Sequence, residues 1–457
     1  MTESPNKRVY RRFVDEVING GDTSVISELY HPDYIDHSAP PGAPSGLSVF
    51  DQVAGVQKMF RGAFPDVHFT IDSMVEEGDW VGTRVTGEAQ HIGGPFMGIA
   101  PSGRRVVWSS FGMFRIEDGR IAEHYGQPDL LGLREQLALK AEPGSLDENR
   151  AIVSAYVYNT NLGNFDAFDE FVVPDYVDND PIPGQKSGRE GLKDAYRMFL
   201  AAFPDVWFTF EDLIAEGDLV VGRGVIKGTH KGDFLGIPPS GKELHWTGTR
   251  MFRVRNGKVV EGWINLDFLG LMQQMGAIPA PPPAPPAAPS SSRLRGAPST
   301  PADNAALMRR FIDEVWNKGN FEVADEIFHP EATSPSAPSL PPGGAGVRVI
   351  AEMFRNAFPD YRMEITHLVA EDSRVAARFR QGGTHKGDLM GIAPTGKRVE
   401  WTEIGILRIA DGKVVESWYD VDMLGLMGQL GVGGGGGSNG SGQPAGVAPA
   451  GAAAREG

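Results

Sequence analysis

One block of motifs occurs three times along this 457-residue chain. Each copy contains Phe-Pro-Asp, a histidine 27 residues after that Phe, a Gly-Ile-x-Pro-[Ser/Thr]-Gly run, a tryptophan, and an aspartate before a Leu-Gly-Leu segment. The three sets are Phe64, His91, Gly98, Trp108, Asp129; Phe203, His230, Gly236, Trp246, Asp267; and Phe358, His385, Gly391, Trp401, Asp422. Over 49 positions from Gly228 and Gly383, copies two and three share 27 identities. Each copy has about 130 residues, the length of a whole domain, so the chain is expected to fold as three tandem domains.

The spacing of the copies predicts domain boundaries at residues 1–139, 146–278 and 302–432. The linker 279–301 holds nine prolines in 23 residues, which predicts an extended polyproline II spacer. The Gly-rich tail 433–457 has nothing to bury and is expected to be disordered. Because the joint between the first two copies is short, we expect those two domains to dock. The third would then pair with the third domain of another chain, giving a homo-oligomer.

The third copy gives the clearest secondary-structure pattern. Apolar residues recur at helical spacing from Leu307 to Trp316, and further helices are expected at 321–328, up to Phe358, and at 424–430. Strands are expected at 362–370, 375–385, 398–409 and 413–422, with Asp411-Gly412 as a hairpin turn. Helices followed by a run of antiparallel strands predict the α+β class. A curved sheet packed against helices leaves a concave apolar pocket.

Composition excludes several kinds of protein. The chain has no Cys, so disulfides, thiolate catalysis and Cys-ligated metals are absent. A net charge of −16 without basic runs argues against nucleic acid and anionic membranes as partners. No signal peptide or membrane span is evident, which favours a cytoplasmic protein. The histidines show no metal-binding spacing, and no nucleophile elbow or dinucleotide fingerprint occurs, so neither metal nor cofactor is expected.

The second copy carries AAFPDVWFTFEDLIAEGD, GTHKGDFLGIPPSGK and HWTGTRMFRVRNGKVVEGWINLDFLGLMQQMGAI. These segments resemble the SnoaL-like polyketide cyclase family, which has the cone-shaped nuclear transport factor 2-like fold. The resemblance covers all three copies. It implies three cone-shaped domains, each with N-terminal helices on a curved antiparallel sheet. It also implies a cofactor-independent bacterial enzyme of antibiotic biosynthesis that closes rings in aromatic polyketide esters by an aldol reaction.

The last strand of each copy alternates polar and apolar residues. Its polar face carries Glu261, Trp263, Asn265 and Asp267 in copy two. We interpret this face as lining the pocket, with Glu261 left to solvent. The substrate-binding candidates from it are Tyr125, Gln127, Trp263, Asn265 and Trp418. The resemblance matches Asp129, Asp267 and Asp422 to the family's general acid/base aspartate. A desolvated carboxylate has a pKa raised toward neutrality, which suits removal of a proton next to a carbonyl.

Other columns of the repeat leave more than one interpretation open. His91, His230 and His385 could contact a substrate carbonyl or orient the aspartate, or could equally cap the Gly-rich turn that follows. Trp108, Trp246 and Trp401 fit core or pocket wall. Arg84, Arg223 and Arg378 are expected to form structural salt bridges.

One histidine distinguishes the copies. His37 occupies a position where the family commonly has a catalytic histidine, whereas copy two has Asn179 and copy three has Pro335. We therefore rank the pockets of copies one and two above that of copy three.

The sequence thus predicts a polyketide cyclase acting by aspartate acid/base chemistry on a small aromatic polyketide. Two alternatives remain open. One is another reaction in the same pocket, such as epoxide opening, dehydration or assisted hydroxylation. The other is a ligand-binding or scaffold protein with some inactive domains.

Overall fold

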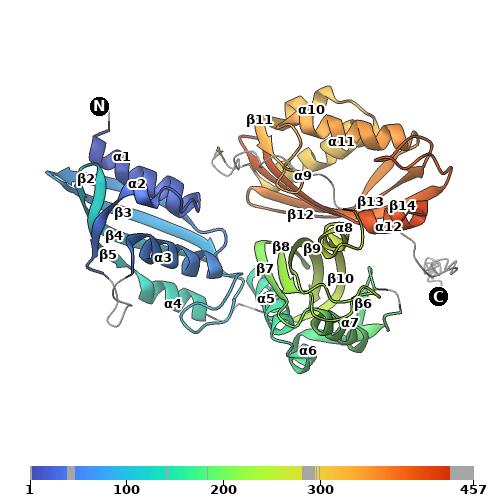
Figure 1. Cartoon of the computed structure of the whole chain (residues 1–457), viewed down its shortest axis with the longest axis horizontal. Coiled ribbons are helices and arrows are strands. Elements are labelled where there is room, and N and C mark those ends of the chain that lie inside the picture. Colours follow the sequence, from blue (N-terminus) through green and yellow to red (C-terminus); the bar gives the residue numbers. More distant parts are fainter. Residues whose placement is uncertain are drawn as a thin grey trace, which may run out of the picture.

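The computed structural model describes residues 3–38, 47–139, 143–182, 184–279, 294, 296–297 and 299–432. These residues form three α+β domains that share one succession of elements: N-terminal helices, a short strand, a long helix, four longer strands and a closing helix (Figure 1). The expected spacer lies mostly, and the expected tail entirely, outside the described residues.

Domain 1 consists of α1 (Pro5–Arg12), the π-helical segment Phe13–Asn19, α2 (Ile26–Leu29), β1 (Tyr30–Asp36), α3 (Val49–Ala63), β2 (His68–Glu77), β3 (Trp80–Gln90), β4 (Arg105–Glu117), β5 (Arg120–Pro128) and α4 (Leu130–Ala138). Domain 2 consists of α5 (Leu146–Asn161), the 3₁₀ turn Phe165–Ala167, α6 (Phe168–Phe171), β6 (Val172–Asp178), α7 (Gly188–Ala202), β7 (Trp207–Glu216), β8 (Leu219–Thr229), β9 (Glu243–Arg255), β10 (Lys258–Leu266) and α8 (Phe268–Met275). Domain 3 consists of α9 (Pro301–Arg310), the π-helical segment Phe311–Asn317, α10 (Glu322–Ile327), β11 (Phe328–Thr333), α11 (Gly344–Ala357), β12 (Arg362–Glu371), β13 (Arg374–Thr384), β14 (Arg398–Ala410), β15 (Lys413–Val421) and α12 (Met423–Leu430).

Each sheet has five strands and is mixed, with the orders β1-β5-β4-β3-β2, β6-β10-β9-β8-β7 and β11-β15-β14-β13-β12. The four longer strands are antiparallel neighbours as expected, but β1, β6 and β11 add a parallel edge strand that was not expected. In domain 3 this strand follows helix α10 without a break and contains Pro330, which is why the sequence pattern hides it. Proline is tolerated there because the strand lies at the sheet edge.

Local sequence signals account for where elements begin and turn. Helices α3, α5 and α9 each start after a Ser or Thr whose hydroxyl accepts a backbone N–H two or three residues into the helix, namely Ser48, Ser145 and Thr300. The expected Asp411-Gly412 hairpin is confirmed, with φ values of 50° and 69°. Both residues adopt positive φ because a two-residue hairpin loop of this kind requires it.

Domains 2 and 3 pack sheet against sheet. The convex faces of both sheets, on the side away from their helices, meet in one apolar cluster formed by Ile214, Val221, Met251 and Trp263 of domain 2 with Val369, Ala376, Ile404 and Ile406 of domain 3. The Arg223 guanidinium lies 4.7 Å from the ring centroid of Trp418 across this interface. Domain 2 uses this face to bind domain 3 of the same chain and not domain 1. Domain 1 contacts domain 2 elsewhere: Arg104 lies 3.5 Å from Asp147, and Ile92 packs into the core of domain 2.

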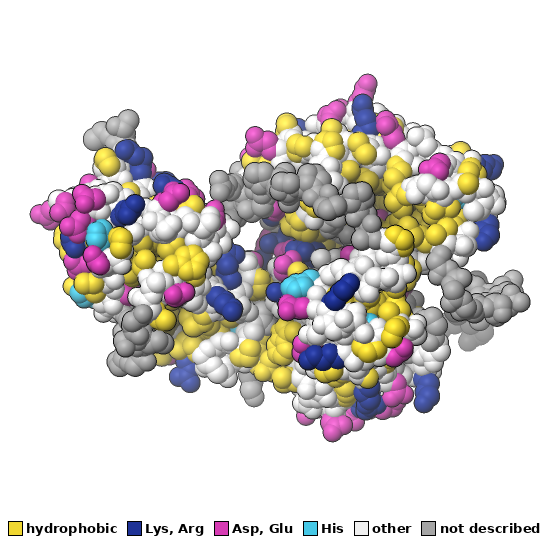
Figure 2. All heavy atoms as spheres, viewed as in Figure 1, with side chains coloured by type: hydrophobic (Ala, Val, Ile, Leu, Met, Phe, Trp, Pro, Cys, Tyr) yellow, Lys and Arg dark blue, Asp and Glu magenta, His cyan; other side chains and the backbone are white. Residues whose placement is uncertain are grey.

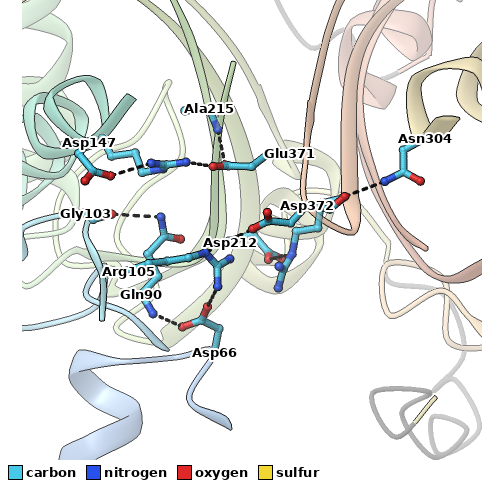
Figure 3. A network of polar contacts seen from close by, with 12 residues as sticks. Asp66, Gln90, Gly103, Arg105, Asp147, Asp212, Ala215, Asn304, Glu371 and Asp372 are labelled. Carbon is cyan, nitrogen blue, oxygen red and sulfur yellow. Dashed lines mark hydrogen bonds and ion pairs between the residues drawn. The ribbon is translucent and has the colours of Figure 1, made fainter. Parts of the chain in front are cut away.

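Domain 1 meets the other two domains at one end only. The junction is rich in charged groups (Figure 3), and Ile92 of domain 1 also packs into the apolar core of domain 2. The guanidinium of Arg105 in domain 1 lies 3.8 Å from the carboxylate of Asp66 in the same domain. It also lies 3.6 Å from the carboxylate of Asp372 in domain 3. In the same junction, Glu371 of domain 3 pairs with Arg150 of domain 2. Figure 2 shows positive and negative side chains side by side between the domains. The junction of domain 1 therefore combines several charged groups with one buried apolar residue, whereas the interface of domains 2 and 3 has a larger apolar cluster.

Candidate functional site

Domain 3 encloses a cavity of about 320 Å³ between the concave side of its sheet and its helices. Strands β14 and β15 contribute Glu403, Ser417, Tyr419 and Val421, while the helices supply mainly apolar side chains such as Phe311 and Trp316. Leu269, from α8 of domain 2, also lines the cavity. An apolar pocket of this size with a few convergent polar groups is typical of a small-molecule site.

The carboxyl group of Glu403 is the outstanding polar group of this cavity. Glu403 is 6 % exposed, and its Oε2 accepts a 2.6 Å hydrogen bond from Nε2 of Gln381. Tyr361 in turn donates its hydroxyl to Gln381 Oε1, at 2.5 Å, which fixes the amide orientation. Desolvation by burial raises the pKa of Glu403 to about 7, and the nearby Asp420 also raises it. A carboxyl group with this pKa can take or give a proton near neutral pH.

Tyr419 is the second titratable group at the cavity wall of domain 3. Burial raises the pKa of its phenol, and the nearby Glu403 raises it further. The phenol therefore stays protonated at neutral pH and is a hydrogen-bond donor for an oxygen in the cavity.

Domain 2 encloses a smaller cavity of about 150 Å³ on the equivalent side of its sheet. Its two carboxylates already have partners: Asp178 accepts from Gln185 at 2.9 Å, and Asp180 pairs with Arg378 of domain 3 at 2.9 Å. Trp246 lines this cavity, and its buried indole nitrogen has no hydrogen-bond partner among the described residues. Both carboxylates at the wall of this cavity are therefore engaged, one by an amide and one by a cation.

The predicted aspartates lie where the last strand of each domain turns into its closing helix. Asp129, Asp267 and Asp422 are the N-cap residues of α4, α8 and α12, and each accepts a backbone N–H, from Gly132, Gly270 or Gly425, at 2.8–2.9 Å. Asp422 stands between Val421 and Met423, which line the cavity of domain 3. Helix capping therefore explains why an aspartate occurs in all three copies, and its catalytic role stays a prediction.

The histidines at the equivalent position of the three domains share the same burial and the same Nδ1 hydrogen bond. His91, His230 and His385 are fully buried, and each Nδ1 accepts the backbone N–H of Ser102, Ser240 or Thr395 at 3.2–3.3 Å. Each ring also packs on the Phe of the Phe-Pro-Asp motif. Of the two open interpretations, the geometry matches the capping of the Gly-rich turn. Burial lowers the pKa of His91 to about 4, which keeps its ring neutral.

The polar face of the last strand does not line the cavities of domains 2 and 3, whereas in domain 1 it lines an open groove on the convex side. Trp263 and Trp418 lie at the interface of domains 2 and 3, where Asn265 donates to Thr402 Oγ1 at 3.1 Å. In domain 1 the equivalent Tyr125 and Gln127 are exposed on the convex face. Strand alternation was assigned correctly, but the other face, with Ile264 in domain 2 and Tyr419 in domain 3, lines the cavities.

His37 also lies on the convex side of domain 1. It stacks on Tyr125 with ring centroids 4.1 Å apart, and its Nε2 lies 2.9 Å from Glu123. An open groove runs past these rings and Arg84. His37 therefore contacts the face that domains 2 and 3 use for packing.

The remaining columns are structural. Trp108, Trp246 and Trp401 are buried in the cores, and Trp246 also lines the cavity of domain 2, as predicted for core or pocket wall. The expected salt bridges of the arginine column are confirmed: Arg84 lies 3.8 Å from Asp72, Arg223 lies 2.8 Å from Glu211, and Arg378 pairs with Asp180.

Sequence reasoning missed Glu403. At the equivalent position copies one and two have Ser110 and Gly248, so no threefold pattern marks it. The signal was its register: Glu403 lies two residues from Trp401, on the same, inward face of a strand. An acidic residue at an inward position is the feature that would have found it.

No helix within the described ranges is long and apolar enough to span a bilayer. No cluster of three or more His, Asp or Glu side chains in the same residues is arranged to hold a metal ion.

The fold and the cavity together define a class of protein: tandem α+β cones, each built around a small-molecule pocket. The SnoaL-like polyketide cyclase family matches residues 8–137, 150–275 and 306–430, which is most of the chain. The chain belongs to this family, with three tandem copies of its domain, and is a cyclase-like enzyme.

Characterised relatives are similar to one domain at a time. Nogalonic acid methyl ester cyclase of Streptomyces nogalater is 31 % identical over 121 residues, which is 26 % of this chain and 87 % of the relative. Aklanonic acid methyl ester cyclase DnrD of Streptomyces peucetius is 30 % identical over 128 residues, 28 % of this chain and 86 % of the relative. Both relatives are cyclases of methyl esters by name.

Solved structures also match single domains. TsrD from Streptomyces laurentii is 28 % identical, covering 30 % of this chain and 98 % of its own, with a TM-score of 0.27. AclR of Streptomyces galilaeus, described as a putative hydroxylase, is 33 % identical. The match covers 29 % of this chain and 83 % of AclR, with a TM-score of 0.27.

Proposed function

We propose that the cavity of domain 3 closes a ring in an aromatic polyketide ester, with Glu403 as the catalytic base. The observation that carries this proposal is a buried carboxyl group with a pKa of about 7 at the wall of an apolar cavity. The aromatic ester substrate is inferred from the names of the relatives. This places the chemistry in the copy that the sequence ranked last.

The reaction balances without any added reagent. The Glu403 carboxylate takes a proton from a carbon next to a carbonyl, and the resulting carbanion forms a C–C bond to a second carbonyl carbon of the same molecule. The second carbonyl oxygen then receives a proton and becomes a hydroxyl, for which the Tyr419 phenol is the donor on the cavity wall; the Glu403 proton restores the phenol. Positioned proton transfer of this kind contributes on the order of 10²–10⁴-fold to the rate.

The environment of Glu403 suits a base rather than an ion pair. No cation is among its hydrogen-bond partners in the described part of the chain; its partner is the neutral amide of Gln381. Pairing with a cation would lower the pKa of the carboxyl and weaken the base.

The test is product analysis by mass spectrometry with candidate aromatic polyketide methyl esters. Wild-type chain should give a product of unchanged mass and new retention time, and Glu403→Gln should lose at least 10²-fold in kcat/KM. Asp129→Asn, Asp267→Asn and Asp422→Asn are the matched controls, because these aspartates are the competing candidates for the base. Loss of activity in Asp422→Asn, with Glu403→Gln unaffected, would reject Glu403 and favour the capping aspartate.

A second function, ligand binding without chemistry, fits the cavity of domain 2. The supporting observation is the unpartnered indole N–H of Trp246 in a cavity whose carboxylates are already bonded. If this is right, Trp246→Phe should weaken binding of the ester or its product, measured by calorimetry, without changing turnover at saturating substrate. An unchanged affinity would contradict it.

A further inference from the structure

One arginine of domain 2, Arg250 on β9, lines the cavity of that domain and has no acidic partner. The domain contains six other arginines, and each forms an ion pair with a carboxylate: Arg150, Arg189, Arg197, Arg223, Arg253 and Arg255. Among the residues that the structure describes, Arg250 forms no ion pair, and its Nη1 donates a hydrogen bond to the hydroxyl of Tyr196. Charges with little access to water are normally paired, and Arg250 is the exception in this domain.

Three aromatic rings surround the guanidinium of Arg250. Its central carbon lies 5.4 Å from the ring centroid of Tyr156 and 5.5 Å from those of Tyr196 and Phe252. The two tyrosine hydroxyls lie 2.8 Å apart, and burial raises the pKa of Tyr156, which keeps that phenol neutral. Cation–π contacts hold the guanidinium in place, but they do not neutralise its charge.

Two carboxylates also line this cavity, and neither forms an ion pair with Arg250. Asp180 pairs with Arg378 of domain 3 at 2.9 Å. Asp178 accepts a hydrogen bond from the Gln185 amide at 2.9 Å, and its charge acts on Arg250 through space without an ion-pair contact. The guanidinium is therefore available to an anion that enters the cavity.

Arg250 is a feature of domain 2 and not of the repeated fold. Strand pairing places Gly112 of domain 1 and Gly405 of domain 3 at the equivalent position. Because the same sheet forms twice with glycine at this position, the fold does not need a guanidinium there. Arg250 therefore distinguishes the cavity of domain 2 from the concave sides of the other two domains.

The rest of the cavity wall is mainly apolar. Phe199, Leu200, Phe208 and Phe268 contribute to it, and the enclosed volume is about 150 Å³. An apolar cavity of about 150 Å³ in another protein encloses benzene, so this volume suits one aromatic ring. An arginine guanidinium binds a carboxylate through two parallel N–H···O hydrogen bonds. The wall and the cation together favour a ligand that has both an aromatic ring and a carboxylate.

We infer that the cavity of domain 2 binds an aromatic carboxylate, with the carboxylate on Arg250 and the ring that carries it against the apolar wall. The inference rests on the binding role proposed above for domain 2 and specifies its ligand as an anion. A neutral ester, the substrate proposed for domain 3, would leave this guanidinium without a counter-ion, which is unfavourable away from water. Domains 2 and 3 thus select ligands of different charge.

Calorimetry on the full chain with two probes, benzoate and methyl benzoate, tests the inference. Wild type should bind benzoate at least about tenfold more tightly than methyl benzoate, because the charge-assisted pair forms with benzoate alone. Arg250→Gln should lose this preference by weakening the binding of benzoate, with methyl benzoate unaffected. Arg255→Gln is the matched control, because Arg255 lies on the same strand but is exposed and pairs with Asp218; it should bind both probes as wild type does.

Two further variants distinguish failure of the inference from failure of the binding role. Arg250→Lys keeps the charge without the planar fork, so it should retain part of the preference for benzoate, even if Arg250→Gln does not fold by circular dichroism. Trp246→Phe should weaken benzoate binding, because Trp246 lines the same cavity. Equal affinity of wild type for the two probes, or a preference for benzoate that survives Arg250→Gln, would overturn the inference and leave the binding role standing. Wild type that binds neither probe would overturn both.

Discussion

Ionisation of Glu403 is expected to increase activity and to decrease stability as pH rises. Its pKa is about 7 in the folded chain, against an ordinary value of 4.5. The base acts only when ionised, so kcat/KM for ring closure should rise with pH and level off above about 7. A pH profile that is flat from 5 to 9 would reject Glu403 as the base.

The same pKa predicts a loss of stability at high pH. The folded state holds the Glu403 proton more tightly than the unfolded state, so the free energy of unfolding should fall as pH rises from 4.5 through 7. The difference between those pKa values amounts to roughly 3 kcal/mol. Urea denaturation at pH 5 and pH 9 should show this change in wild type, and Glu403→Gln, which cannot ionise, should lack it.

His91 predicts a loss of stability in acid. Burial lowers its pKa from 6.5 to about 4 in the folded chain, so the unfolded state binds the proton first as pH falls. Stability should then decrease between pH 6.5 and 4, by up to roughly 3 kcal/mol for this group. Denaturation of His91→Gln should show a weaker decrease over that range; the same decrease in both proteins would contradict the assignment.

At the scale of elements, two substitutions of the aspartate that caps α12 distinguish a capping role from a catalytic role. Asp422→Ala removes the hydrogen bond to Gly425 and should lower the free energy of unfolding by about 1 kcal/mol. Asp422→Asn keeps an acceptor oxygen and should keep most of that stability. If capping is the whole role, turnover should survive in Asp422→Asn, measured beside Glu403→Gln; a stable but inactive Asp422→Asn would show that the carboxylate is needed for chemistry.

Secondary structure was predictable where its signal is local. The expected strands of domain 3 and the Asp411-Gly412 turn are confirmed to within a residue or two, because alternation and turn chemistry depend only on neighbours in sequence. The parallel edge strand β11 was missed, because its pairing with β15 is made by residues about 85 positions apart.

At the scale of the whole molecule, the interface of domains 2 and 3 should be sensitive to one charge. Ile404 is fully buried between the two sheets, so Ile404→Asp places an unpaired carboxylate there. We expect the two domains to separate while each stays folded, increasing the radius of gyration in small-angle scattering without loss of circular dichroism. Val349→Asp, at an exposed site, is the control, and an unchanged radius in Ile404→Asp would contradict this interface.

The sequence alone determined the number of domains, the α+β class, the family resemblance and the inward-facing tryptophans, because repeats and periodicity are properties of the chain itself. Only the tertiary structure decided which face of each sheet surrounds a cavity and which meets another domain. When both faces of a strand are buried, the sequence pattern does not indicate which face lines the cavity. Trp263 and Asn265 were therefore assigned to the pocket, although they lie at the interface of domains 2 and 3. The register of Glu403 marks it as inward-facing, but its raised pKa comes from burial by residues distant in sequence, which only the tertiary structure shows.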